Sequence, residues 1–519
     1  MKIFHNVLIV GGGTAGWLTA CFLAKTLGER GERAGVGITL VESPEIGIIG
    51  VGEGTFPSIR GTLAAIGLDE ARFMRECHAT FKQGIRFDHW VRPKGAPATG
   101  PDHYFHPFSH PSQRQGSMEL LPYWLRGLAG EGVALADAVT MQKRIADAGR
   151  APKREGDGDF LGPMNYAYHF DAARFATLLA EHGRSLGVKH VLGTVERVAL
   201  GDDGAIASVH TREHGAMSAD LYVDCTGFRA ALIGEALGSP FRRVDDVLFV
   251  DRALAIQVPY PHQDTPIPSY TISTAHEAGW TWDIGLQQRR GIGYAYSSRH
   301  STAARAEEVL REYVGPAGDG IAARALTLNV GYREVQWVKN CVAVGLSGGF
   351  LEPLESSGIS LIETAAYLIG FLFPFNGETA PVAATFNSLM RGRYERVVDF
   401  IKLHYCLTQR RDSAFWIENA DPRSIPATLQ GKLDMWRARA PHRLDFMSDL
   451  EMYPTTSWQY VLYGMEFATQ LHASATDPAR YDAARAEFAA IAQMAARAHD
   501  DLPAHRALVE HFCSRTAGR

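Results

Sequence analysis

A glycine-rich turn near the N-terminus constrains the fold of this chain more than any other feature. A β-branched apolar run at residues 7–10 leads into glycines spaced G-x-G-x-x-G, namely Gly11, Gly13 and Gly16. A helical apolar pattern follows, and residues 37–42 predict a second strand that ends at acidic Glu42. The first glycine permits a tight turn, the second lets backbone N–H groups approach a diphosphate, and the third lets helix and strand pack closely. This strand–helix–strand unit predicts dinucleotide binding, with Glu42 accepting hydrogen bonds from a ribose.

A second sequence feature is needed to decide between FAD and NAD, because both present the same ADP half to such a unit. Thr14 and Ala15 open the helix at which the diphosphate is expected. Far downstream, Asp224 and Gly227 belong to an Asp-Cys-Thr-Gly turn after a buried apolar run. Two-part FAD proteins often bring backbone close to the ADP half at such a turn, which favours FAD. The alternatives are a plain glycine-rich turn for the first motif and an ordinary α/β turn for the second.

Composition and charge exclude several other classes of function. The 519-residue chain is long enough for two or three structural units, and its net charge of −5 comes without a long basic run. Neither nucleic acid nor an anionic membrane surface is therefore an expected partner. The six cysteines are scattered without a C-x-x-C pair or a Cys/His cluster, which predicts no metal site and no disulfide scaffold. The scattered cysteines fit a reducing cytoplasm as the expected location, and no apolar stretch is long enough to span a bilayer.

The residue pattern divides the chain into an α/β part and a helical part. Residues 1–360 alternate strand and helix patterns, which predicts an α/β nucleotide-binding body. A region rich in Gly, Pro and His interrupts this body at about residues 93–160 and is expected to cover a substrate. Residues 361–519 carry helical patterns with almost no strand signal, which predicts a mainly helical substrate domain.

Four stretches together carry a resemblance to a known family. They are VGGGTAGW at residues 10–17, GVGEGTFPSI at 50–59, WTWDI at 280–284 and GGFLEPLESSGI at 348–359. From residue 1 to about residue 465 the chain resembles the flavin-dependent halogenases, the group typified by the tryptophan halogenases. The resemblance implies an α/β fold, in which an FAD-binding Rossmann-like domain of the flavin monooxygenase type is joined to a mainly helical substrate-binding domain.

The resemblance also implies a reaction. In that family a separate flavin reductase supplies reduced FAD, which reacts with oxygen and oxidises chloride or bromide to hypohalous acid. The acid then crosses a tunnel in the protein to a small aromatic substrate that never touches the flavin. The expected substrate is an electron-rich ring, in particular an indole. The oligomeric state stays open, with a homodimer as one option.

Two residues match the catalytic pair of the family. Lys82, in ATFKQGI, matches the essential lysine, which could polarise hypohalous acid as an ammonium or form a haloamine as a neutral amine. Glu355, in LESSG, matches the catalytic glutamate, which would orient hypohalous acid, stabilise the cationic ring intermediate and help to remove its proton. The alternatives are a solvated lysine and an acid at a helix start, a position that Glu352 shares.

The residues after Glu355 and an earlier loop are expected at the flavin. Ser356 would lie between the flavin and substrate sites, and the N–H groups of Ser357 and Gly358 would bind the halide at a helix start. A simple helix N-cap is the alternative for Ser356. The mobile strap that this family places over the flavin matches Gly52, Glu53, Gly54 and Thr55. A plain surface loop is the alternative for the strap.

Aromatic side chains are expected to hold the substrate and to separate it from the flavin. Trp280 and Trp282, two residues apart on a predicted strand, should share one face and form the wall that this family places before the flavin. His106, Phe108 and Trp458 match the side chains that sandwich the indole. Ordinary core packing is the alternative for these aromatic residues, and a solvent-exposed histidine for His106.

The expected pocket differs from that of halogenases acting on free tryptophan. Those enzymes use a pair of tyrosines, a glutamate and an asparagine to grip the charged ends of the amino acid. The approximately matching positions here are Phe446 with Met447, Tyr453 and Leu462, and only Glu451 is near enough to restore one contact. A buried zwitterion without partners is costly. Free tryptophan is therefore expected to be a poor substrate, and an indole without the charged group, or one carried on something larger, a better one.

Other functions remain as alternatives. A flavin monooxygenase would oxygenate its substrate directly, which the tryptophan wall and Lys82 oppose. A non-catalytic FAD-binding relative would yield only peroxide from reduced FAD and oxygen. A nicotinamide dehydrogenase is not favoured, because no second nucleotide fingerprint was found.

Overall fold

The chain folds into two compact units, each assembled from three separate stretches of sequence. Unit 1 comprises Met1–His78, Phe170–Val244 and Asn329–Glu395; unit 2 comprises Ala79–His169, Asp245–Leu328 and Arg396–Arg519. The sequence suggested one boundary near residue 360, whereas strands of both units come from the first 360 residues. Local patterns do not reveal which strands share a sheet. The computed structural model describes residues 3–28, 35–47, 52–97, 102–112, 118–447 and 451–514.

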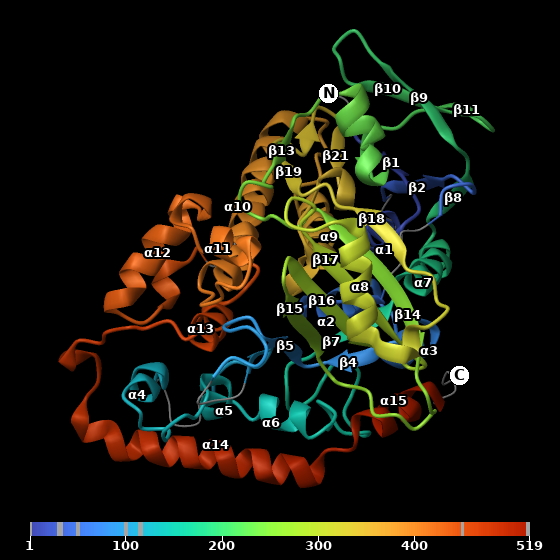
Figure 1. Ribbon diagram of the computed structural model, residues 1–519. Helices are drawn as coiled ribbons and strands as arrows, with labels where there is room; N and C mark the ends of the chain where they lie inside the picture. The colour runs from blue at the N-terminus through green and yellow to red at the C-terminus, as the bar shows by residue number, and fades with distance from the viewer. Residues whose placement is uncertain are drawn as a thin grey trace. The chain divides into compact units, whose positions relative to one another are not determined.

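The central sheet of unit 1 is built around the N-terminal strand–helix–strand unit (Figure 1). Its order is β20-β21-β12-β1-β2-β8, and all neighbours are parallel except β20 with β21. The strands are Trp337–Val338 (β20), Cys341–Ala343 (β21), Leu221–Asp224 (β12), Asn6–Val10 (β1), Gly37–Glu42 (β2) and Lys189–Leu192 (β8). The carboxyl ends of the parallel strands meet at one edge, where ligands of such sheets bind.

Helices cover this sheet. α1 (Thr14–Leu27) follows β1, and α7 (Ala172–Ser185) and α9 (Ser357–Phe371) pack against α1. Packing is close, because a Cβ added to Gly183 of α7 would lie 3.1 Å from the Trp17 ring. Unit 1 also contains α2 (Ser58–Ile66), α3 (Glu70–Glu76), an antiparallel sheet of β9 (Val195–Leu200), β10 (Ile206–Thr211) and β11 (Gly215–Met217), and another of β13 (Phe241–Arg243), β19 (Gly331–Arg333) and β22 (Gly349–Phe350).

A seven-stranded sheet forms the centre of unit 2, in the order β18-β14-β17-β16-β15-β5-β6. Its neighbours are antiparallel except β15 with β5. The strands are Arg324–Thr327 (β18), Arg252–Pro259 (β14), Arg289–Tyr296 (β17), Gly279–Gly285 (β16), Thr271–His276 (β15), Gly84–Asp88 (β5) and His103–Pro107 (β6). α8 (Ala303–Val314) lies across β14 and β17 and buries Leu254, Ile292 and Leu310 between helix and sheet (Figure 1).

The rest of unit 2 is largely helical. β4 (Thr80–Lys82) pairs antiparallel with β7 (Ala167–Asp171). The region expected to cover a substrate holds β6 and three short helices, α4 (Leu121–Leu125), α5 (Leu135–Val139) and α6 (Gln142–Asp147). After β22 the described chain contains only helices, as the sequence predicted. Beyond α9 the α-helices are α10 (Thr379–Cys406), α11 (Ala414–Asn419), α12 (Ala427–Ala438), α13 (Thr455–Gly464), α14 (Tyr481–Asp501) and α15 (His505–Ser514).

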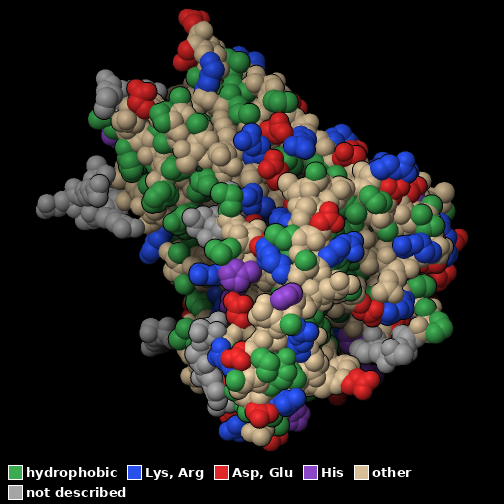
Figure 2. All heavy atoms as spheres, turned by 90° about the vertical axis from the view of Figure 1, so that its left-hand side faces the viewer, with side chains coloured by type: hydrophobic (Ala, Val, Ile, Leu, Met, Phe, Trp, Pro, Cys, Tyr) green, Lys and Arg blue, Asp and Glu red, His purple; other side chains and the backbone are tan. Residues whose placement is uncertain are grey.

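Acidic and basic side chains are interspersed over the face drawn in Figure 2. All six cysteines are free thiols. Among the described residues, no helix combines the length and the apolar character needed to cross a membrane.

Candidate functional site

The glycine turn after β1 has the backbone that dinucleotide binding requires. Gly11 has φ +113°, and a Cβ there would lie 2.2 Å from the Cys225 carbonyl oxygen. At Gly16 a Cβ would lie 1.9 Å from the Gly11 carbonyl oxygen, so only glycine allows α1 to start this close to the strand. Among the described residues, no atom lies within 4 Å of a Cβ added to Gly13. This open space adjoins the first N–H groups of α1, which have no side-chain cap and suit a diphosphate.

Glu42 stands at the carboxyl end of β2, next to the same turn. A Cβ at Gly12 would lie 1.5 Å from Glu42 Oε2, so the carboxylate folds over the glycine turn. Its other oxygen, Oε1, is 2.7 Å from His190 Nε2, which holds the side chain in place. The position fits an acceptor for ribose hydroxyls beside a diphosphate at Thr14 and Ala15.

The turn after β12 is organised by the buried carboxylate of Asp224. One oxygen accepts hydrogen bonds from the Thr226 amide and hydroxyl at 2.9 and 2.7 Å. The other accepts from the Leu232 and Ile233 amides at 2.9 and 2.8 Å. Gly227 follows with φ +70°. Because four donors already bind the Asp224 carboxylate, a nucleotide at this turn would meet the backbone rather than that side chain.

The segment expected to cover the flavin begins as a short strand, β3 (Gly52–Gly54). Residues 50–51 of its motif lie outside the described part of the chain. Thr55 is buried, and burial raises the pKa of Glu53 to about 7. The carboxyl of Glu53 is therefore largely neutral below that pH.

The turn before α9 carries the predicted catalytic glutamate. Glu355 ends a 3₁₀ turn (Pro353–Glu355) and is fully buried. Ser356 follows at the N-cap position of α9 in the left-handed region at φ +57°, and its side chain makes no capping hydrogen bond to the helix. Holding a non-glycine residue in this region costs about 1–2 kcal/mol and is typical of functional turns.

The start of α9 offers donors to an anion. Ser357 is buried, and its hydroxyl oxygen has no hydrogen-bond partner within the described chain. In the part of the chain that the structure describes, no atom lies within 4 Å of a Cβ added to Gly358. The first N–H groups of a helix lack intrahelical acceptors. These donors, an unpartnered hydroxyl and open space fit a halide ion.

Lys82 ends β4 in unit 2, and its side chain is fully buried. Its Nζ atom is 5.3 Å from the centre of the Phe108 ring, a cation–π distance. The alternative of a solvated lysine is therefore wrong. Of the two predicted catalytic residues, Lys82 thus belongs to unit 2 and Glu355 to unit 1.

A buried aromatic cluster of unit 2 contains the three residues expected to hold the substrate. His106, Phe108 and Trp458 are 0%, 5% and 0% exposed, so His106 is not a surface histidine. Phe400 of α10 links them, since its ring centre is 6.0 Å from that of His106 and 4.9 Å from that of Trp458. Tyr453 stacks on Phe400 at 4.1 Å. Sequence analysis missed Phe400, because an aromatic residue in a helical apolar pattern carries no signal of what it faces.

Trp280 and Trp282 share one face of β16, as their spacing predicted. Their ring centres are 6.1 Å apart. Trp282 lies over Gly293 of the neighbouring strand, where a Cβ would be 2.0 Å from the ring. Trp280 lies 6.4 Å from Trp90. Packing holds both indoles in place, which suits a wall as well as a core.

Comparison with known proteins decides the family. Residues 6–480 match the sequence profile described as tryptophan halogenase. Tryptophan 6-halogenase SttH of Streptomyces toxytricini is 37% identical over 519 residues, with 96% of each chain covered. The chain belongs to the tryptophan halogenase family.

Other members of the family extend this likeness to the whole fold. The crystal structure of a tryptophan halogenase from Shewanella frigidimarina is 40% identical with a TM-score of 0.94, covering 99% of this chain and 98% of that one. The 7-chloro-L-tryptophan 6-halogenase KtzR of a Kutzneria species is 36% identical over 520 residues, covering 96% of this chain and 98% of its own. The protein is therefore an enzyme, a flavin-dependent halogenase, as the sequence motifs predicted.

The halogenase buries a second basic group on the strand-pair face that carries Lys82. In the β4–β7 register, Lys82 and His169 are diagonal neighbours. His169 Nε2 is 2.8 Å from the Thr271 hydroxyl, and Nδ1 is buried without a hydrogen-bond partner in the described chain. Burial, and then Lys82 and His505, hold the pKa of His169 well below its ordinary value. The imidazole is therefore neutral.

His505 of α15 fixes the strand that carries Lys82 in the halogenase. Its Nδ1 is 2.8 Å from the Ile267 carbonyl oxygen and must donate, which leaves Nε2 to accept from the Phe81 amide at 3.1 Å. Burial lowers the pKa of His505 to about 4, which keeps the ring in the neutral form that both bonds need. No sequence signal pointed to this residue, which lies 424 positions from Phe81.

The acid considered for gripping free tryptophan is already paired in this halogenase. Glu451 Oε1 is 2.9 Å from Arg396 Nε, and the Glu451 side chain is 7% exposed. Lys432 lies nearby, with Nζ 4.9 Å from the Trp458 ring centre and 3.3 Å from Asp399. Burial raises the pKa of Glu451, while Lys432 and Arg396 oppose the shift. A carboxylate held by an arginine is a poorer partner for a substrate ammonium.

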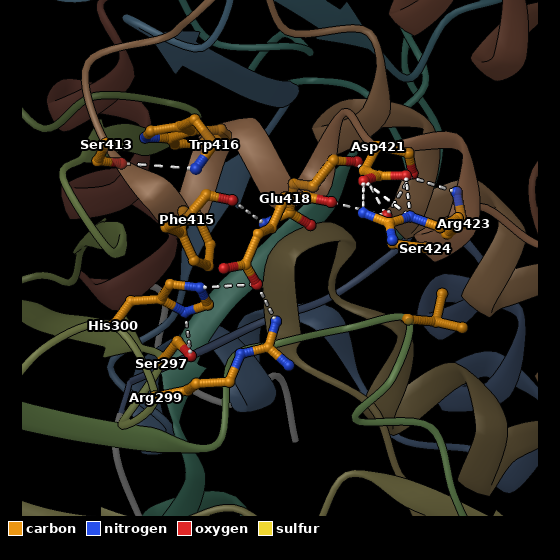
Figure 3. Close-up of polar contacts among 12 residues, drawn as sticks. Ser297, Arg299, His300, Ser413, Phe415, Trp416, Glu418, Asp421, Arg423 and Ser424 are labelled. Carbon is orange, nitrogen blue, oxygen red and sulfur yellow. Dashed lines mark hydrogen bonds and ion pairs between the residues drawn. The ribbon is translucent and has the colours of Figure 1, made fainter.

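A hydroxyl–imidazole–carboxylate row elsewhere in unit 2 has the components of a hydrolase triad (Figure 3). Ser297 Oγ is 2.9 Å from His300 Nδ1, and His300 Nε2 is 3.2 Å from Glu418 Oε2. Ser297 is only 1% exposed, so a substrate carbonyl cannot reach its hydroxyl. Glu418 also binds Arg299 at 2.6 Å. The row joins the turn after β17 to α11 and is structural in the halogenase.

Proposed function

We propose that this halogenase uses reduced FAD, oxygen and chloride or bromide to halogenate an indole that lacks the charged ends of a free amino acid. The observation that carries the proposal is the buried Lys82 beside the aromatic cluster of His106, Phe108 and Trp458. Electrophilic halogenation needs a donor that polarises the halogenating agent and flat side chains that orient the ring. Both occur together in unit 2.

Unit 1 would hold the flavin. The open start of α1 at Gly13, Thr14 and Ala15 would bind the diphosphate, Glu42 the ribose, and residues 52–55 would cover the ring system. A separate reductase would deliver reduced FAD. Together with oxygen, the bound reduced FAD would provide the oxidising power that converts halide to hypohalous acid. The backbone at Gly227 would approach the ADP half.

The start of α9 would bind the halide. The amides of Ser357 and Gly358 and the unpartnered Ser357 hydroxyl would donate to chloride or bromide. The left-handed backbone of Ser356 turns the chain between Glu355 and this helix, so that one short turn carries both the halide donors and the acid.

Lys82 and Glu355 would act on the electrophile and on the ring. The Lys82 ammonium donates a proton to the oxygen of hypohalous acid, the halogen bonds to a ring carbon, and the oxygen leaves as water. Glu355 stabilises the positive charge on the ring and accepts the proton that the substituted carbon loses. We favour the ammonium over a haloamine, because Lys82 Nζ lies 5.3 Å from the centre of the Phe108 ring, a position that suits a cation. Trp280 and Trp282 would keep the ring away from the flavin.

The substrate proposal departs from the names of the relatives, which give tryptophan for SttH and 7-chloro-L-tryptophan for KtzR. Free tryptophan needs partners for an ammonium and a carboxylate. Glu451 is paired with Arg396, Leu462 and Tyr453 are buried, and Met447 is 64% exposed. The positions that would have to bind the amino-acid ends thus provide no uncommitted carboxylate. An uncharged indole avoids this desolvation cost.

A mass-spectrometric assay tests the proposal. The full-length protein is mixed with FAD, a generic flavin reductase, NADH, and either chloride or bromide, with indole or free tryptophan as substrate. We expect a product with the isotope pattern of the added halide, formed faster from indole. A halide-independent oxygenated product would point to a monooxygenase, and peroxide alone to a non-catalytic relative. Faster turnover of tryptophan would contradict the pocket argument.

A further inference from the structure

A buried carboxyl without a part in the proposed chemistry lies in the helix that starts at the halide site. Glu363 is the only charged residue of α9 and is 7% exposed. It follows Ser357 by six residues, which is about 9 Å along a helix axis. A charge at this distance within the same helix acts on any anion bound at the helix start.

Hydroxyl groups, rather than basic groups, bind this carboxyl. Ser58 Oγ donates to Glu363 Oε2 at 2.7 Å, and Ser360 Oγ lies 3.2 Å from Ser58 Oγ. Oε1 is buried and has no hydrogen-bond partner in the described part of the chain. The described elements packed on α9 contribute three charged residues, namely Lys25 in α1, Arg60 in α2 and Glu355 in the 3₁₀ turn before α9.

The environment keeps Glu363 neutral up to neutral pH. Burial raises the pKa of Glu363 to about 7, and the hydroxyls of Thr62, Ser58 and Ser360 act in the opposite direction. The carboxyl is therefore mostly protonated at pH 6 and mostly ionised at pH 8. Ionisation places a negative charge inside α9 where none stood before.

We propose that Glu363 is a positioning residue that makes halide binding depend on pH. In its neutral form it leaves the start of α9 open to an anion, and in its ionised form it repels the anion from within the helix. The inference rests on the proposed halide site at Ser357 and Gly358. Ser58 opens α2 three residues after Thr55, so the same carboxyl also ties the segment expected over the flavin to the halide helix.

The size of the effect follows from the separation. Two unit charges about 9 Å apart at an effective dielectric constant of about 20 change an affinity by about twentyfold. Screening by salt and solvent reduces this to about fivefold. Halide affinity should thus fall about fivefold between pH 6 and pH 8.

Chloride binding to the full-length protein with oxidised FAD tests the inference, measured by ³⁵Cl NMR line broadening at pH 6 and pH 8. The wild type should lose about fivefold in affinity across this range. Glu363→Gln should bind chloride at both pH values as the wild type does at pH 6. Glu70→Gln is the matched control, because it removes another buried carboxyl of unit 1, from α3 rather than α9, and it should keep the wild-type pH dependence.

The outcomes separate this inference from the halide site on which it rests. Chloride binding with the same pH dependence in Glu363→Gln would overturn the role of Glu363 and leave the halide site standing. A Glu363→Gln variant weakened equally at both pH values would also overturn it, because that is the mark of a merely structural residue. Absence of chloride binding in the wild type at both pH values would overturn the halide site and the inference together.

Discussion

The two units keep opposite kinds of ionisable group neutral in their interiors. In unit 1, burial raises the pKa of the Glu53 and Glu363 carboxyls to about 7. In unit 2, burial lowers the pKa of the His276 imidazole to about 3 and that of His505 to about 4, and holds that of His169 well below its ordinary value. Unit 1 thus removes negative charge where anions are proposed to bind. Unit 2 removes competing positive charge where a lysine is proposed to act.

Buried carboxyls also occur in unit 2, but there they have basic partners. Burial raises the pKa of Asp399 and Glu451, while Lys432 and Arg396 oppose the shift. Glu363, by contrast, has only hydroxyl partners among the described residues. The contrast teaches that burial alone does not define these sites, and that the partner decides which charge state a buried acid keeps. It also predicts opposite responses of the two units to pH.

The largest effect is expected when the buried Lys82 side chain of unit 2 is removed. Lys82→Ala should lower halogenation at least about a thousandfold, because the polarising donor is lost, while FAD binding and peroxide formation in unit 1 continue. Product formation by mass spectrometry and FAD binding by fluorescence check both parts. Lys143→Ala, which removes a lysine paired with Asp147 in the same unit, is the control and should stay active. Halogenation retained in Lys82→Ala would remove that residue from the mechanism.

The next effect concerns acid sensitivity of unit 2. Because the pKa of His505 falls from its ordinary 6.5 to about 4 on folding, the unfolded state binds more protons between these values. The stabilisation is therefore complete above pH 6.5 and is lost as the pH falls towards 4, by about 3 kcal/mol. Urea titrations followed by hydrogen exchange of residues 79–90 would measure this locally. His505→Asn should start less stable and lose less, and an unchanged slope would show that another group titrates.

Unit 1 should respond in the opposite direction. A Glu363 carboxyl with a pKa of about 7 in the folded state binds more protons than the unfolded chain between pH 4.5 and 7. Stability is therefore lost as the pH rises through this window. Glu363→Gln should be more stable than the wild type by about 2 kcal/mol at pH 8 and equally stable near pH 5, as measured by urea unfolding. A Glu363→Gln variant that is less stable than the wild type at pH 8 would contradict the opposite pH responses of the two units.

The smallest expected effect tests whether a paired acid in unit 2 can be turned towards substrate. Arg396→Gln removes the ion pair of Glu451 and leaves its carboxylate for a substrate ammonium. The ratio of kcat/KM for free tryptophan to that for indole should rise about threefold, in line with the modest strength of such pairs. Competition assays with both substrates in one tube would show the ratio directly. A ratio that stays constant would place the amino-acid end of tryptophan away from Glu451.

The parts of this enzyme that follow from local spacing were predictable from sequence. The need for glycine at position 16 follows from a short spacing, because a Cβ there would meet the carbonyl oxygen of Gly11. The shared face of Trp280 and Trp282 follows from strand periodicity. The mainly helical character of the described residues after 361 also follows from local pattern. The family motifs pointed to Lys82 and Glu355 because each lies in a short, recognisable stretch.

The parts that depend on distant contacts were not predictable. His505 reaches Phe81 across 424 positions, and Phe400 joins His106 to Trp458 from a helix with an ordinary apolar pattern. The division into units was missed for the same reason, since strand pairing such as β15 with β5 joins residues about two hundred positions apart. Glu363 gave no signal, because a single acid in an apolar helix does not reveal whether its partners are basic groups or hydroxyls.

The way the chain alternates between its units limits how the enzyme can be taken apart. The backbone passes from one unit to the other after residues 78, 169, 244, 328 and 395. No single truncation of the gene yields either unit intact, and a chimaera that exchanges one unit with a relative needs several joints at once. During ribosomal synthesis, the central sheets of both units can be completed only late. The reason is that β21 of unit 1 and β18 of unit 2 both lie beyond residue 320. Engineering of the substrate region is thus better served by point substitutions than by grafted segments.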